Sequence, residues 1–153
     1  MICAVSTLQI SAMPYSTDAD LYDRIDQEMV VQLTDDANAG EVDQTKLDNL
    51  RSDCSELINT YLRGRYTVPV DPAPEILVNI EADLLVHKLY QRRSGYEIPD
   101  SISDSKKDAM ELLKQINLGK VLLEEQPDIS AGQIQTNKKS TDRLFTDDRL
   151  KRY

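Results

Sequence analysis

The chain has 153 residues, of which 29% are charged and 40% hydrophobic, a length typical of one domain with a modest core. No window approaches about 18 uncharged apolar residues, so we expect no contact with a membrane. The net charge of −9 argues against direct binding to DNA, because neutralising phosphates requires clustered cations.

The N-terminal region is expected to form two short helices. In "PYSTDADLYDRID", Thr17 can serve as an N-cap, and Asp18 and Asp20 favour the positive end of the helix dipole. "DQEMVVQLTDD" predicts a separate short helix, and "TDDANAGEVD" is typical of a turn. The apolar faces consist of Leu21, Tyr22 and Ile25 in the first helix, and of Met29, Val30 and Leu33 in the second.

Residues 43–63 predict an amphipathic helix with a polar opposite face. Its apolar stripe is Leu47, Leu50, Cys54, Leu57 and Tyr61, widened by Ile58 and Leu62. Gly64 is expected to end this helix as a left-handed C-cap residue. Cys3 and Cys54 form neither a disulfide framework nor a metal-binding spacing, so Cys54 is expected to be a buried free thiol.

The segment "RYTVPVDPAP" interrupts the helical pattern. Pro69, Pro72 and Pro74 remove backbone donors and bias the preceding residues to extended conformations. We therefore expect an extended central loop, with Pro74 in the first turn of the next helix.

Residues 75–92 predict a long helix that is apolar on almost every side. Such a helix is either central or covered by a partner, and we expect both: packing inside the bundle and against a neighbouring subunit. The sole histidine, His87, follows Asp83 by one helical turn, but no other imidazole or thiolate is near in sequence. We interpret His87 as a packed or partner-bonded helix residue.

A fourth long helix follows the loop "RSGYEIPDSISDS", with Ser103 or Ser105 as its cap and Gly119 near its end. Its inner stripe is Ala109, Leu112, Leu113 and Ile116. The predicted fold is therefore all-α, a small bundle of four to five helices with an extended Pro-rich central loop and an extended C-terminal tail.

The tail, residues 124–153, lacks periodicity until its last residues. Residues 138–153 carry six Lys/Arg against three Asp/Glu, about +3, so residues 1–137 sum to about −12. A polar linker that ends in an apolar, cationic peptide is typical of a docking segment. The residues expected to bind a partner are Arg143, Leu144, Phe145, Arg149, Leu150 and Tyr153.

The chain resembles the Mu-like phage head–tail connector family, small neck or adaptor proteins. The resemblance rests on "MPYSTDADLYDRID", "EMVVQLTDD", "GEVD", "DCSELINTYLRGRYTVPVDPAPEILVNIEADLLVHKLYQRR" and the terminal "RLFTDDRLKRY". The helix ending "INTYLRGRY" followed by "PVDPAP" is its most specific part. Related chains usually begin near Met13, so residues 1–12 are interpreted as an N-terminal extension or as the consequence of an upstream start codon. Residues 13–123 are interpreted as the connector domain and 124–153 as the docking tail.

The resemblance implies a structural virion protein at the head–tail junction, assembled in the host cytoplasm. It implies a ring of about twelve copies beneath the portal, linked to the next neck, stopper or tail-completion protein. Double-stranded DNA would pass through the lumen without specific binding, and an acidic body suits such a lumen. The residues expected at the contact between subunits are Arg63, Arg65, Tyr66, Val68, Val86 and Tyr90.

Two other functions remain open. A small regulatory or adaptor protein could use the same tail to bind one partner, and it would form one-to-one complexes or dimers instead of rings. An enzyme with a carboxylate metal site is poorly supported, because the acidic residues are spread over exposed helix faces. We expect no catalytic residues, no metal site and no cofactor.

Overall fold

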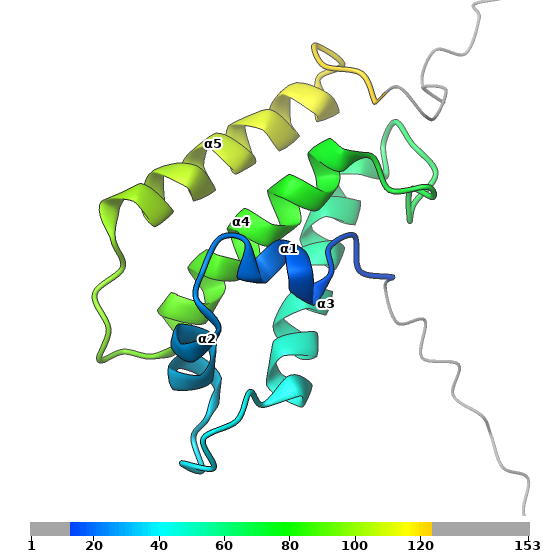
Figure 1. Ribbon diagram of the computed structural model, residues 1–153. Helices are drawn as coiled ribbons and strands as arrows, with labels where there is room; N and C mark the ends of the chain where they lie inside the picture. The colour runs from blue at the N-terminus through cyan, green and yellow to red at the C-terminus, as the bar shows by residue number, and fades with distance from the viewer. Residues whose placement is uncertain (1–12, 124–153) are drawn as a thin grey trace, which may run out of the picture.

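The computed structural model describes residues 13–123, and this range folds into five α-helices without a strand (Figure 1). The helices are α1 (Asp18–Tyr22), α2 (Gln27–Thr34), α3 (Gln44–Leu62), α4 (Glu75–Arg92) and α5 (Asp100–Asn117). The predicted all-α bundle is confirmed. No helix in this range combines the length and the apolar composition that crossing a membrane requires.

Helix α4 is the central element. It packs against α5, α3, α1 and α2, and half of its 18 residues are buried. This explains why its apolar residues point in almost every direction: other parts of the same chain cover it on several sides. The predicted central position is confirmed, whereas the expected contact with a neighbouring subunit stays a prediction.

The N-terminal helices are held by local polar contacts. Thr17 is the N-cap of α1, as predicted, and its backbone N–H donates to the Asp20 carboxylate at 2.7 Å. The Thr17 hydroxyl also donates to the Asp20 carboxylate, and this bond, together with the one from the backbone N–H, lowers the pKa of Asp20. Asp43 caps α3, with its side chain accepting from the backbone N–H of Lys46 at 3.1 Å.

Two predicted helix ends are wrong. Gly64 has no left-handed φ; instead, the backbone N–H groups of Arg65 and Tyr66 both donate to Leu62 O, and Arg63 is a right-handed C-cap. Because the turn stays right-handed, no glycine is required there.

The start of α5 differs from the prediction as well. The helix begins at Asp100 with Pro99 as its N-cap, so neither Ser103 nor Ser105 caps it. The carbonyl of Pro99 accepts from the N–H groups of Ile102 and Ser103, which starts the hydrogen-bond ladder earlier than the serines indicated. At the other end, Gly119 has the left-handed φ of +73° expected of a residue that ends a helix.

The loop of residues 63–74 contains no helix, as predicted, but it packs onto the bundle. Tyr66 and Val70 are buried at 1% and 2% exposure. The Tyr66 hydroxyl accepts from the backbone N–H of Leu123 at 3.2 Å. The peptide bonds before Pro69 and Pro72 are cis. The loop is therefore part of the core and not a free extended arm.

Candidate interaction surfaces

A buried polar network ties the first described residues to α3 and α4. Glu81 in α4 has no exposed surface, and its carboxylate accepts from the backbone N–H of Ser16 and from the hydroxyl of Ser55. A buried carboxylate needs such partners, because desolvation of an unpaired charge is costly. The network is closed to solvent and fixes the N-terminal segment, so we assign it a structural role.

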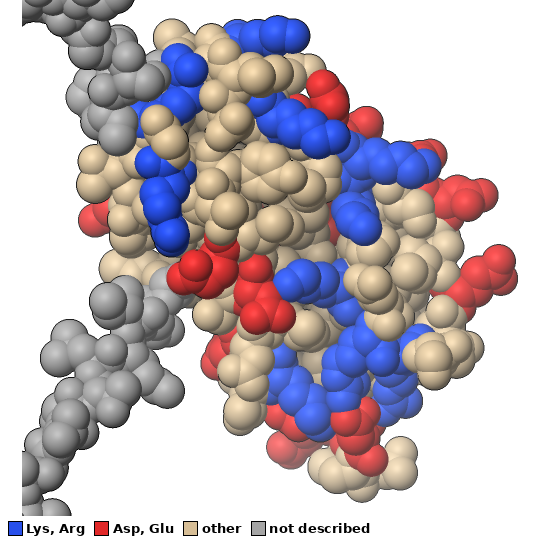
Figure 2. Space-filling view, turned by 180° about the vertical axis from the view of Figure 1, so that it is seen from behind, with Lys and Arg blue, Asp and Glu red and all other residues tan. Residues whose placement is uncertain are grey.

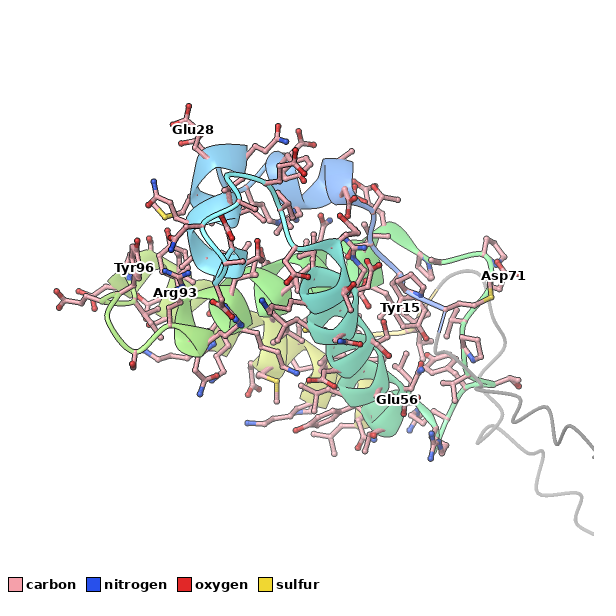
Figure 3. All side chains as sticks on the ribbon, turned by 90° about the horizontal axis from the view of Figure 1, so that it is seen from below. Tyr15, Glu28, Glu56, Asp71, Arg93 and Tyr96 are labelled. Carbon is pink, nitrogen blue, oxygen red and sulfur yellow. The ribbon has the colours of Figure 1, made fainter. Side chains whose placement is uncertain are left out.

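Tyr15 extends this network to the central loop. Its hydroxyl donates to the side-chain oxygen of Asn59 and accepts from the backbone N–H of Val70 at 3.2 Å. Burial raises the pKa of the Tyr15 phenol, which keeps the group neutral and able to donate. Figure 3 shows Tyr15 against α3, close to the loop that carries Asp71.

In the range from 13 to 123, the two residues with the most reactive side chains, Cys54 and His87, are packed. Cys54 is a buried free thiol, as predicted, and burial raises its pKa to about 12. His87 is 8% exposed, and burial together with the charge of Lys106 lowers its pKa. The expectation that His87 is a packed helix residue is confirmed. Within residues 13–123, no group of three or more His, Cys, Asp or Glu is placed to hold a metal ion.

Five of the six residues expected at a subunit contact fall into two groups. Arg63 keeps 67% of its side chain exposed, and Val68 and Tyr90 are half-buried. Tyr66 and Val86 are 1% and 5% exposed because the chain's own core encloses them. This corrects the expectation that these two side chains are available to a neighbour.

Arg65 belongs to neither group, because it packs within the chain. The side chain is half-buried, and its guanidinium lies directly over Gly119. The expected tail contacts of Arg143, Leu144, Phe145, Arg149, Leu150 and Tyr153 fall outside the described residues and stay predictions.

A pocket of about 290 Å³ lies at the junction of α1 and α2. We call it the acidic pocket. It is lined by Tyr22, Asp23, Arg24, Ile25, Asp26, Met29 and Tyr90. Asp23 and Asp26 are exposed, and neither makes an ion pair within the part of the chain that the structure describes. Arg24 is engaged elsewhere: its Nε lies 2.9 Å from Asp83 Oδ1, and another guanidinium nitrogen donates to Asn79 at 2.6 Å.

An exposed patch of Leu118, Lys120 and Leu122 lies at the other end of the bundle, where α3 ends and the loop of residues 63–74 begins. We call it the hinge-end patch. Leu118 and Leu122 are 64% and 60% exposed. The preceding Asn117 donates to the backbone carbonyl of Tyr61 at 2.6 Å, which brings this patch beside the end of α3 and Arg63. On the face turned away from α1, Lys and Arg side chains border a broad uncharged area (Figure 2).

Neither of these two surfaces is predicted by the sequence patterns. Five acidic residues between positions 18 and 28 were the available signal for the acidic pocket: Asp18, Asp20, Asp23, Asp26 and Glu28. Figure 3 shows Glu28 projecting from α2 away from the bundle. Leu118 and Leu122 follow the inner stripe of α5 too closely to be recognised as exposed without a structure.

The comparison with known families identifies the chain. A family model described as "Bacteriophage Mu, Gp36" matches residues 15–141, well over half of the chain. The chain belongs to the bacteriophage Mu Gp36 family. No curated protein matches it. The predicted resemblance to Mu-like phage proteins is thus confirmed at the level of the family.

The Gp36 family match includes both surfaces and the buried network, since all three lie between residues 15 and 123. It also runs past the last described residue as far as residue 141. The terminal "RLFTDDRLKRY", residues 143–153, is not included, so the expected docking role of this peptide gains no support from the match.

Proposed function

We propose that this Gp36-family chain is a non-enzymatic subunit of the phage head–tail connector. About twelve copies would form a closed ring beneath the portal, and the ring would link the portal to the next neck or tail component. The observation that carries the proposal is the match of residues 15–141 to a family of phage Mu, joined to the resemblance of the central "INTYLRGRYTVPVDPAP" to connector proteins.

The charge of the bundle supports this proposal. Residues 13–123 contain 21 Asp/Glu and 12 Lys/Arg, so the body of the subunit is strongly acidic. A ring built from acidic bodies would repel the phosphates of DNA in its lumen, and the DNA would pass without being held. Such a role requires no cofactor and no membrane contact, and it places the protein in the virion.

Electron microscopy of the full chain mixed with purified portal tests the proposal. We expect a ring of many copies on one end of each portal, with portal alone as the control. If the chain binds the portal one-to-one, or binds only another type of protein, the alternative of a regulatory adaptor replaces the connector. Absence of any multi-copy assembly, both on portals and free in solution, would contradict the proposed function.

A further inference from the structure

The acidic pocket and the hinge-end patch lie at opposite ends of the bundle. The pocket is formed by the α1–α2 junction and by Tyr90 near the C-terminal end of α4. The patch follows the C-terminal end of α5. This end lies beside the C-terminal end of α3, on the side of the molecule opposite to α2 (Figure 1). Since the two surfaces face different ends, they cannot contact each other within one folded chain.

The hinge-end patch has the properties of an anchor. The described residues contain four exposed large hydrophobic side chains, Met13, Tyr96, Leu118 and Leu122, and two of them are in this patch. Lys120 lies between them in sequence, and it makes no ion pair within residues 13–123. Exposed leucines beside an unpaired cation favour a partner with an apolar pocket and negative charge.

The acidic pocket offers this combination. Its exposed lining is mainly polar, and the half-buried Tyr22, Met29 and Tyr90 supply a smaller apolar part; its volume of about 290 Å³ is large enough for a leucine side chain. Asp23 and Asp26 supply two exposed carboxylates without an ion pair in the described range. Because Arg24 already binds Asp83 and Asn79, its charge is directed away from them.

We propose that the hinge-end patch of one copy binds the acidic pocket of the next copy. The occupant of each surface is thus a second copy of this chain, with Leu118 and Leu122 packed on the apolar lining and Lys120 beside Asp23 and Asp26. A contact between two different surfaces is heterologous, so a bound pair still has one free pocket and one free patch, and further copies can add until the assembly closes into a ring when the rotation allows. This inference rests on the proposed function, since it names the contact that would join the copies of the ring.

Two variants of the full chain, each blocked at one surface, test the contact. Asp23→Lys with Asp26→Asn reverses the charge of the pocket and keeps a residue that can cap α2. Lys120→Glu with Leu122→Asp reverses the charge of the patch and removes an anchor. The matched control is Asp104→Lys with Asp108→Asn. It makes the same charge change as the pocket variant, but at two exposed residues of α5 that lie outside both surfaces. Circular dichroism verifies that all variants are folded.

Assembly is measured by mass photometry in solution and by electron microscopy on portals. Each blocked variant alone is expected to assemble at least about tenfold more weakly than the wild type, because like charges would face each other across the contact. A mixture of the two is expected to form at least one-to-one pairs, since the intact pocket of one variant binds the intact patch of the other. Larger assemblies would join the two altered surfaces, which carry opposite charges but lack the Leu122 anchor, and are expected to be weaker than those of the wild type. The control variant is expected to assemble as the wild type does.

Normal rings from either blocked variant would overturn this contact and leave the connector function intact. Loss of assembly in both variants without pairing in the mixture would also overturn it, because the two intact surfaces should still bind. If the wild type itself forms no multi-copy assembly in either setting, the failure belongs to the proposed function.

Discussion

Three glycines of the chain occupy different environments and form a matched series. Gly119 has a φ of +73° and lies beneath the guanidinium of Arg65, which a Cβ atom would overlap. Gly40 has a similar φ of +78°, but open space surrounds it. Gly64 also has open space, and its φ is outside the left-handed region. The series therefore separates the cost of backbone strain from that of steric overlap.

We expect Gly40→Ala to lower the free energy of unfolding by about 1–2 kcal/mol, the cost of a left-handed φ at a residue with a Cβ atom. Gly119→Ala should lower it by at least as much, because the flexible end of the Arg65 side chain must also move. Gly64→Ala should leave it unchanged or raise it by about 0.5 kcal/mol, since alanine restricts the unfolded chain. Urea denaturation followed by circular dichroism measures all three, and a loss at Gly64 equal to that at Gly119 would contradict this reasoning.

Glu81 marks the limit of what single residues reveal in the sequence. Its helix was predicted with the correct bounds, but its buried partners Ser16 and Ser55 are 65 and 26 residues away in the chain. Tertiary packing decides which distant polar groups meet, and no local pattern pairs them. By contrast, burial of Cys54 was predictable, because its position on an apolar helical stripe already places it in the core.

At the scale of elements, the connection between α2 and α3 is fastened to the end of α4. The Asp36 carboxylate binds the guanidinium of Arg92, lies 3.3 Å from a guanidinium nitrogen of Arg93, and lies 3.0 Å from Lys46 Nζ. Arg92 also donates to the backbone carbonyl of Leu33 at 2.7 Å. Figure 3 shows Arg93 and Tyr96 together at this end of the molecule. The hydrogen bonds from Arg92 and Lys46 lower the pKa of Asp36 to about 2.

This low pKa predicts an acid-sensitive contribution to stability. Because the pKa is depressed in the folded state, the contribution is complete above the ordinary value of 3.8 and is lost as the pH falls toward about 2. Asp36→Asn should therefore lower the Tm at pH 6 and flatten its decrease between about pH 4 and pH 2. The control Asp71→Asn removes an exposed carboxylate that has no ion pair within residues 13–123, and the steep decrease should remain. Thermal melts at several pH values measure both, and equal slopes for the wild type and Asp36→Asn would contradict the assignment.

The helices themselves were predictable to different degrees. The bounds of α4 agree with the expected residues 75–92, because prolines precede it and its apolar residues are dense. The start of α5 was not predictable, because the backbone carbonyl of Pro99, and not a serine side chain, forms the first hydrogen bonds of the helix. The all-round apolar surface of α4 had two explanations, and only packing shows that the chain's own helices cover much of it.

At the scale of the whole molecule, the hydrophobic core extends over the full length of the described range. Within residues 13–123, the buried residues of the core run from Tyr15 to Leu123, and the backbone N–H of Leu123 donates to the Tyr66 hydroxyl. Both surfaces proposed to join neighbouring copies also lie within this range. We therefore expect folding, the proposed association of copies and the proposed attachment to the portal to be separable.

Deletion of residues 144–153 tests this separation. The deletion should leave the helical circular dichroism and the Tm unchanged, because it keeps all five helices and every core residue of the described range. It should also leave the pairing of the two blocked variants intact, and it should abolish attachment to portals, since it removes Leu144, Phe145, Arg149 and Leu150. The control replaces the same ten residues by a scrambled order with unchanged composition and charge, and it should fail to attach as well if the order of apolar and cationic side chains matters. Attachment of the deleted chain at the wild-type level would exclude the docking role of the tail, whereas a lower Tm would show that the folded unit extends beyond Leu123.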